Sequence, residues 1–177
     1  MERTEVLTLE EISMPRAAGY LDMIDEFEAA GEGYPYNNIA LARRDFAAFV
    51  RELEDEKHGI GLPPGIVPQT TYVLVRDGER VLGEFRFRPT VPPPFRTNNG
   101  HIGYNVRPSE RRKGYATRGL AMLLSKAREL CMEGVMLPVV GENAGSVRAI
   151  EKNGGRLERR VAGPRSGRVV SWYWVRV

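Results

Sequence analysis

A basic, glycine-containing turn is the part of this sequence best suited to bind a ligand. It reads Arg111-x-x-Gly114-x-Ala116 and lies between a predicted strand, residues 100–106, and a predicted helix, residues 114–131. A helix that begins here directs unpaired backbone N–H groups, and the positive end of its dipole, at one place. Gly114 and Ala116 carry little or no side chain, so an anion can approach the backbone closely. The turn therefore predicts a phosphate site.

Two common phosphate loops do not occur in the chain. A Walker loop needs G-x-x-x-x-G-K-[ST], a dinucleotide fingerprint needs G-x-G-x-x-G after a strand, and neither run is present. The turn instead resembles motif A of the GNAT superfamily of N-acetyltransferases, Gln/Arg-x-x-Gly-x-Gly/Ala after a strand that ends in Val-x-Pro. Val106-Arg107-Pro108 supplies that ending here. The resemblance is closest to a group of bacterial predicted acetyltransferases that carry GHIGY-x-[VI]-RPSER-x-KGYAT.

A second segment, GENAGSVRAIEKNGG at residues 141–155, resembles motif B of the same superfamily through Asn143, Lys152 and Gly154. Together the two motifs place the resemblance over roughly residues 70–160. It implies an α/β (α+β) fold with a mixed, mostly antiparallel central sheet. That sheet has about six to seven strands, is splayed between strands 4 and 5, and is flanked by about four helices.

The resemblance implies acetyl-coenzyme A as co-substrate and no metal. Its pantetheine arm lies in the splay like an added strand, and its pyrophosphate lies on the N–H groups of the turn. The implied cofactor-binding residues are Tyr104, Asn105, Val106, Arg111, Arg112, Lys113, Gly114, Tyr115, Ala116, Thr117 and Asn143. Arg112, Lys113 and Arg118 are candidates for the outer phosphates, and the alternative is a solvated basic face. Pro138 lacks an N–H group, so strand pairing should fail beside it.

The family's reaction is direct attack of a neutral amine on a thioester in a ternary complex. An alkyl amine of pKa about 10.4 costs about 4.6 kcal/mol to deprotonate at pH 7, and an α-amino group of pKa about 8 costs about 1.4 kcal/mol. An α-amino group therefore needs less help from a base. The backbone N–H of Val106 is the expected donor to the thioester oxygen.

The catalytic base and acid are left open by the sequence. His101 is one candidate base, because an ordinary histidine titrates near neutral pH, and the alternative is a strand residue with a satisfied hydrogen bond. Glu84 is a second candidate. The tyrosine that many family members use as an acid is replaced here by Ile150. Tyr104, Tyr115 or a water molecule are the possible substitutes.

The acceptor site is expected near the first two helices and their loops, at Tyr20–Asn38 and His58–Gln69. Tyr34 and Tyr36 either line a pocket there or pack. Three glutamates are candidates for attracting a cationic amine: Glu26, Glu28 and Glu32. The alternative for them is a charged helix face.

Length and composition indicate one globular domain, residues 1–177. We divide it into an acceptor-shaping part (1–69), a cofactor-binding core (70–160) and a C-terminal hairpin (161–177). Apolar residues make up 42% and charged residues 28%, as in ordinary globular proteins, and 26 basic against 23 acidic residues leave a net charge of +3. No run of about 18 apolar residues and no signal sequence is seen, so we expect a cytoplasmic protein with no membrane partner.

Hydrophobic periodicity predicts the remaining elements. The expected strands are 5–9, 70–76, 80–88, 100–106, 134–140, 156–161 and 169–177. The expected helices are 20–30, 39–57, 114–131 and 144–152. Cys131, the one cysteine, is expected to be buried late in its helix, where it would be a core residue and not a nucleophile.

Three functions are compatible with these features. The leading one is an acetyl-coenzyme A-dependent N-acetyltransferase whose acceptor is an amine of a small molecule or protein. The second is a GNAT-fold module that binds acyl-coenzyme A without turnover, which the loss of the tyrosine at position 150 favours. The third is a nucleic-acid-binding domain, but acidic residues are spread through the chain and no aromatic residues interleave with a basic stripe. We therefore expect no nucleic-acid partner, and a homodimer is compatible with the sequence.

Overall fold

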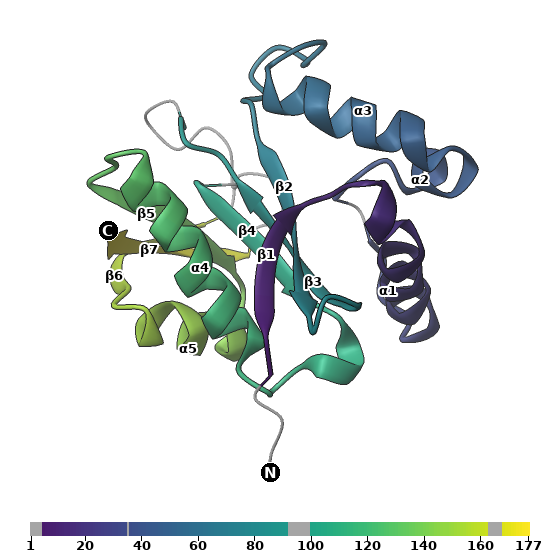
Figure 1. Cartoon of the computed structure of the whole chain (residues 1–177). Helices are drawn as coiled ribbons and strands as arrows, with labels where there is room; N and C mark the ends of the chain where they lie inside the picture. The colour runs from purple at the N-terminus through teal and green to yellow at the C-terminus, as the bar shows by residue number, and fades with distance from the viewer. Residues whose placement is uncertain (1–4, 35, 92–99, 163–167) are drawn as a thin grey trace.

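The computed structural model describes the chain except for residues 1–4, 35, 92–99 and 163–167. The described part contains seven strands and five α-helices (Figure 1). The strands are β1 (Leu7–Glu11), β2 (Thr70–Arg76), β3 (Arg80–Phe87), β4 (Ile102–Val106), β5 (Gly134–Val140), β6 (Arg156–Ala162) and β7 (Val169–Arg176). The helices are α1 (Ala17–Ala29), α2 (Ile39–Arg44), α3 (Phe46–Lys57), α4 (Tyr115–Glu129) and α5 (Ala144–Lys152), with short 3-10 turns at Met14–Arg16 and Pro108–Glu110.

The strands form two sheets, with the order β1-β2-β3-β4 in one and β5-β7-β6 in the other. Neighbours within each sheet are antiparallel. The break lies between β4 and β5, so the predicted α/β fold with a sheet splayed at this point is confirmed. The connection between β6 and β7 falls largely at residues 163–167, outside the described residues.

Hydrogen bonds between His101 and Met136 join the two sheets at the base of the break. The His101 N–H donates to the Met136 carbonyl at 2.8 Å, and the Met136 N–H donates to His101 Nδ1 at 2.9 Å. Because the Gly141 N–H donates to the Val169 carbonyl, the odd-numbered residues of β5 bond to β7 and the even-numbered ones face β4. Pro138 is the next residue to face β4, and it has no N–H to donate. Pairing between the strands therefore stops there.

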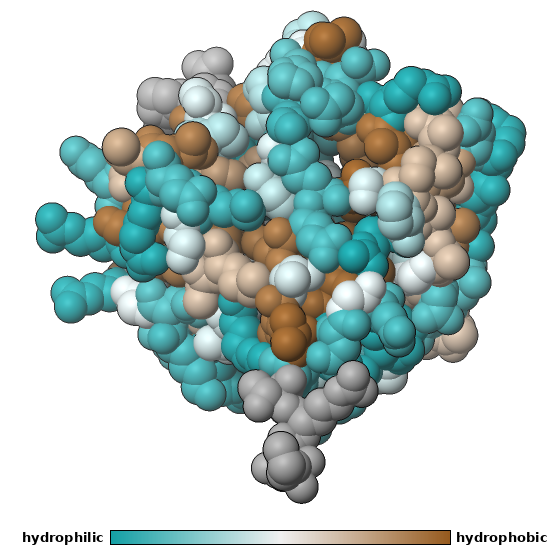
Figure 2. All heavy atoms as spheres, viewed as in Figure 1, coloured by the Kyte–Doolittle hydropathy of each residue, from teal (hydrophilic) through white to brown (hydrophobic). Residues whose placement is uncertain are grey.

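Two hydrophobic cores cover opposite faces of the first sheet. On β3, Phe85 packs on the α4 side, whereas Val81 joins the core formed by α1, α2 and α3. Gly119 of α4 lies against the Phe85 ring, where a larger residue would not fit. The face drawn in Figure 2 is mostly hydrophilic, with a hydrophobic strip along its middle at the position of β1. Figure 1 shows α4 and α1 on either side of this strand.

Two sequence predictions are corrected by the structure. The helix predicted over 39–57 is interrupted at Asp45, whose backbone is extended (φ −152°, ψ 91°) and whose Oδ1 accepts from the Ala48 N–H at 2.9 Å. The Asp45 side chain hydrogen-bonds to the nearby backbone in place of a continuous helix. Asp45 thereby ends α2 and serves as the N-cap of α3. Cys131 is exposed and not buried. Its φ of +55° places it in the turn after α4, where the periodicity of the helix no longer applies.

None of the helices in the described ranges combines the length and the apolar character that crossing a membrane requires. Within the same ranges, no group of three or more His, Cys, Asp or Glu residues is placed to hold a metal ion.

Candidate functional site

Beyond His101, the edge of β4 that faces the break pairs with no described strand, and its Val106 carbonyl accepts from Arg111 Nε at 3.0 Å. The Arg88 N–H donates to the His101 carbonyl at 2.8 Å, and the Arg107 N–H donates to the Leu82 carbonyl at 2.9 Å. Odd-numbered residues of β4 therefore bond to β3, and the N–H and C=O groups of Tyr104 and Val106 point into the break. Asn105, predicted with them as a pantetheine contact, turns its backbone toward β3.

The phosphate turn follows directly after this edge. Arg112 and Gly114 have positive φ angles of 64° and 84°, and α4 begins at Tyr115. No side chain caps the helix, so its first N–H groups remain available. A Cβ atom added at Gly114 would meet nothing within 4 Å, so there is open space in front of the helix. These features fit a pyrophosphate group.

Most side chains of the turn are engaged within the protein. Arg111 makes two hydrogen bonds of 2.7 Å to Glu32, Lys113 bonds Glu110 at 2.9 Å, and Arg118 bonds Glu5 at 2.9 Å. The Tyr115 hydroxyl is within hydrogen-bond distance of Arg76 (3.0 Å) and Glu5 (2.9 Å), on the side of the first two strands. Within the described part of the chain, Arg112 is the predicted phosphate contact that forms no ion pair. The backbone N–H groups are therefore the main donors of this turn that the described side chains leave available.

Glu110 holds the turn in place, and the sequence did not single it out. It is 5% exposed and accepts from Arg80 (2.9 Å), Arg76 (3.3 Å) and Lys113. Burial alone would raise the pKa of this carboxyl, but the hydrogen bonds from Lys113 and Arg80 outweigh it and hold the pKa below its ordinary value. Arg107, 2% exposed, similarly ties the end of β4 to α1 through Glu26 (2.7 Å). A sequence pattern cannot identify such partners, because they lie far away along the chain.

A cavity of about 320 Å³ occupies the break between the two sheets. It is lined by Tyr36, Arg86, Arg88, Ile102, Gly103, Tyr104, Leu137, Pro138, Val139, Val140, Asn143, Ser146 and Ile150. Tyr104 stacks on Phe85, with ring centroids 5.6 Å apart, and its hydroxyl donates to the Ser146 carbonyl at 3.3 Å. Burial raises the pKa of Tyr104 to about 12, so the phenol stays protonated at neutral pH. Asn143 caps α5 by accepting from the Ser146 N–H at 3.0 Å.

Glu84 lies on the opposite face of the sheet and is fully buried. Its Oε2 accepts from the Tyr20 hydroxyl (2.8 Å) and from Asn37 (2.6 Å), and its Oε1 accepts from Arg86 (2.6 Å). The ring of Tyr36 covers Arg86, with the guanidinium carbon 3.9 Å from the ring centroid. Three donors thus surround the Glu84 carboxylate.

The side chain of His101 is fixed by a hydrogen bond from β5. Its Nδ1 accepts from the Met136 N–H, so the neutral ring carries its proton on Nε2 and has no free lone pair there. Burial lowers the pKa of His101, with the charge of Arg88 acting in the same direction. This geometry agrees with the alternative in which His101 is a strand residue with satisfied hydrogen bonds.

The three glutamates near α1 are all engaged in ion pairs. Glu26 bonds Arg107 and the Ser109 backbone, Glu28 pairs with Arg43 at 3.0 Å, and Glu32 pairs with Arg111. The positive partners reduce any attraction of these groups for a cationic amine.

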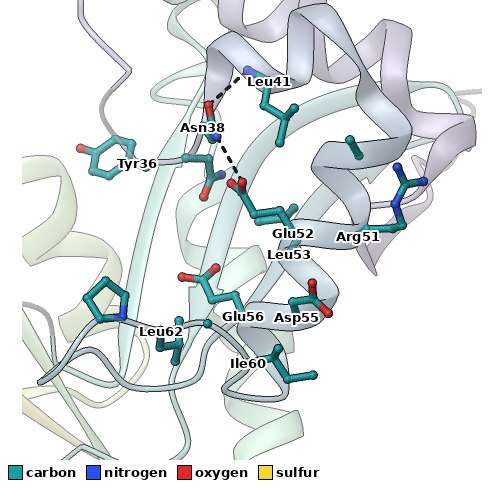
Figure 3. Close-up of a pocket in the computed structure, with 14 residues that line it drawn as sticks. Tyr36, Asn38, Leu41, Arg51, Glu52, Leu53, Asp55, Glu56, Ile60 and Leu62 are labelled. Carbon is teal, nitrogen blue, oxygen red and sulfur yellow. Dashed lines mark hydrogen bonds between the residues drawn. The ribbon is translucent and has the colours of Figure 1, made fainter.

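An outer groove of about 650 Å³ runs along α3 and the loop that follows it (Figure 3). Glu52 and Glu56 point toward the side of Tyr36, whereas Arg51 points away. Asn38 donates to Glu52 at 3.1 Å. Burial raises the pKa of Glu56. Tyr36 lines both this groove and the cavity in the break, so the two spaces meet at its ring.

Comparison with known proteins places this architecture in one family. The family model described as an acetyltransferase (GNAT) domain matches residues 26–156. The chain therefore belongs to the GNAT family of N-acetyltransferases. No curated protein sequence matches it.

Several solved structures are similar to this chain over nearly its whole length. Mycobacterium smegmatis RimJ in complex with coenzyme A disulfide superposes with a TM-score of 0.73 and 18% identity, covering 97% of this chain and 82% of that one. The ribosomal-protein-S5-alanine acetyltransferase of Vibrio fischeri gives 0.71 and 13%, covering 96% and 92%. The microcin C7 self-immunity acetyltransferase MccE, bound to acetyl-coenzyme A and AMP, gives 0.70 and 14%, covering 99% and 94%. At these identities the likeness concerns the fold.

Proposed function

We propose that the protein transfers the acetyl group of acetyl-coenzyme A to a primary amine of a small molecule or protein, by direct attack in a ternary complex. The observation that carries this proposal is the edge of β4 at Tyr104 and Val106, which pairs with no described strand and leads to the uncapped start of α4. The pantetheine arm of coenzyme A can extend along the edge of β4 like an added strand, and its phosphates can bind at the start of α4. The similar structures with bound coenzyme A or acetyl-coenzyme A support the choice of ligand.

Each part of the cofactor has a matching set of residues. The backbone groups of Tyr104 and the N–H of Val106 would bond the pantetheine amides, and the N–H groups between Arg111 and Thr117 would hold the pyrophosphate. Asn143 lines the cavity beside the arm. When bound, acetyl-coenzyme A supplies an activated thioester. Val106 lies at the phosphate end of β4, so we assign its N–H to the pantetheine arm and do not keep the expected bond to the thioester oxygen.

We assign the role of proton donor to Tyr104. The amine nitrogen forms a bond to the acetyl carbon, the carbon–sulfur bond breaks, and the nitrogen releases its proton to water. The Tyr104 hydroxyl then donates a proton to the departing sulfur, and water restores the phenol. Its raised pKa keeps this proton in place at neutral pH, and its contact with Ser146 puts it one turn before Ile150, where other family members carry a tyrosine.

Positioning roles are proposed for the two candidate bases. The hydrogen bond from Met136 supports a role for His101 in joining the sheets. The three donors around Glu84 support a role in orienting Arg86. Without a dedicated base, the neutral amine has to come from the acid–base equilibrium of the acceptor in solution. This favours acceptors whose amine has a low pKa.

The test is a calorimetric titration with acetyl-coenzyme A, followed by an assay of thiol release with a panel of amines. Binding with turnover is the expected result. Binding without turnover of any small or peptide amine would identify a binding module instead. A folded protein that does not bind acetyl-coenzyme A would refute the proposal, and retention on RNA with a steep salt dependence would then support the nucleic-acid-binding alternative.

A further inference from the structure

Arg86 of β3 and Arg88, which follows directly after its end, line the break between the sheets. Arg86 and Arg88 both line the 320 Å³ cavity, and none of its lining residues is acidic. The pantetheine arm that we propose for this space is uncharged, and the phosphates would lie beyond Val106, at the start of α4. The arginines lie beside the start of β4, because Arg86 is across from Gly103 in the sheet. The proposed phosphate site follows the other end of β4, after Val106. The cofactor therefore offers no charge to Arg88 or to the pair formed by Arg86 and Glu84.

Arg86 is held in a defined orientation. It is 4% exposed, bonds Glu84 at 2.6 Å, and is covered by the ring of Tyr36. On its other side lies Gly103, where an added Cβ atom would be 3.3 Å from Arg86 Nη2. A glycine at this position leaves the guanidinium group the space that it occupies. A buried guanidinium with a fixed orientation is suited to binding a planar anion.

Arg88 adds a second positive charge beside it. Burial, followed by repulsion from Arg86, lowers the pKa of Arg88 to about 10, and the Glu56 carboxylate acts in the opposite direction. An anion in the cavity would stabilise this charge. A cationic group in the same place would be repelled by Arg88, since Glu84 balances the charge of Arg86.

We propose that Arg86 and Arg88 bind a carboxylate of the acceptor, so that the substrate class is a small amine that carries a carboxylate, of which the free amino acids are the simplest members. This inference rests on the proposed acetyltransferase function. The charge of Arg88 also disfavours the protonated form of a bound amine, which helps it to become a nucleophile without a dedicated base. The outer groove with Glu52 and Glu56 would favour a cationic acceptor, and it meets the cavity at the ring of Tyr36, so polyamines are included in the test.

The experiment measures thiol release from saturating acetyl-coenzyme A with three sets of acceptors. These are the twenty common amino acids, their carboxamides, and the polyamines putrescine and spermidine. Each set is tested with the full-length parent, with Arg88→Gln and Arg88→Lys, and with Arg44→Gln as a matched control on the exposed end of α2. Circular dichroism and calorimetry with acetyl-coenzyme A confirm that each variant folds and binds the co-substrate.

We expect at least one amino acid to exceed its own carboxamide by about tenfold or more in kcat/KM, because a charged hydrogen bond is lost in the carboxamide. Arg88→Gln should lower kcat/KM for that amino acid by about 10- to 100-fold, mainly through KM, and leave its carboxamide unaffected. Arg88→Lys should recover part of the loss, and Arg44→Gln should behave as the parent.

Three results would overturn the inference. They are a preference for carboxamides or polyamines, an equal effect of Arg88→Gln on an amino acid and its carboxamide, and no turnover of any amino acid by protein that binds acetyl-coenzyme A. The last result leaves the acetyltransferase function intact. Failure to bind acetyl-coenzyme A would instead refute the proposed function itself.

Discussion

Gly114 allows the proposed phosphate site to be tested with two variants that differ only in charge. Its φ is +84°, and a Cβ atom would meet no neighbour within 4 Å. Gly114→Glu and Gly114→Lys should therefore share one structural cost, the left-handed backbone, of about 1 to 2 kcal/mol. In a protein of this size that cost lowers Tm by about 2 to 8 °C. The helix dipole should make the Lys variant the less stable of the two by about 0.3 to 1 kcal/mol.

Binding of acetyl-coenzyme A should follow the opposite order. Two unit charges about 5 Å apart repel by about 1 kcal/mol in water and by about 3 kcal/mol at a partly buried site. Each phosphate charge near Gly114→Glu should therefore weaken binding by about 5- to 150-fold, whereas Gly114→Lys should bind at least as tightly as the parent. Calorimetric titration of both folded variants at low ionic strength measures the difference.

The ratio of the two Kd values for acetyl-coenzyme A tests whether a phosphate group lies beside Gly114. We expect the Glu variant to bind at least about 25-fold more weakly than the Lys variant, because repulsion and attraction add in the ratio. Equal affinities in the two variants would refute the reasoning, since steric and backbone effects are common to both. The ratio should also shrink as salt is added, because exposed charges are screened.

Other consequences of the structure can be tested in the same way. Tyr104→Phe keeps the ring on Phe85 but removes the proposed proton donor, so kcat should fall by about 100-fold with the Kd for acetyl-coenzyme A unchanged; a kcat within twofold of the parent would exclude the role. Asp45→Ala removes the cap of α3 and should cost about 1 kcal/mol, or about 2 to 4 °C in Tm, whereas Asp45→Asn should retain most of it; equal thermal melts for the two would contradict this. His101 has a lowered pKa in the folded protein, so the unfolded chain binds the proton more readily, and its contribution to stability is complete above about pH 6.5 and falls as the pH decreases. Urea unfolding at pH 7.5 and 5.5 should show a smaller loss in His101→Gln than in the parent, and identical losses would be evidence against the buried neutral ring.

Most local elements could be predicted from the sequence, although the first strand and the first helix are shifted by two to three residues and the helix 39–57 is interrupted. The segments 70–76, 134–140 and 144–152 have the predicted bounds, because alternation and helical periodicity depend only on neighbours along the chain. The phosphate turn belongs to the same class, since a glycine that permits a positive φ at a helix start is a local feature. The turn and the segment 141–155 also carried the family resemblance, which the family model confirms.

What the sequence could not predict are the partners of its polar side chains. Glu84 bonds Tyr20, 64 residues away, and Arg107 bonds Glu26, 81 residues away. No periodicity links such pairs. The sequence therefore offered Glu84 as a candidate base, whereas the structure shows its carboxylate surrounded by hydrogen-bond donors. Cys131 was misjudged for a related reason, because its burial depended on where α4 ends.

The sequence by itself therefore determined the elements, their order and the loop that can hold an anion, since these follow from short-range backbone and hydrophobic preferences. Only the tertiary structure decided that the edge of β4 that faces the break leads to that loop and that Arg86 and Arg88 share one cavity with Tyr104. Strand pairing and packing bring these groups together across long stretches of chain, and burial then sets their charges and hydrogen bonds.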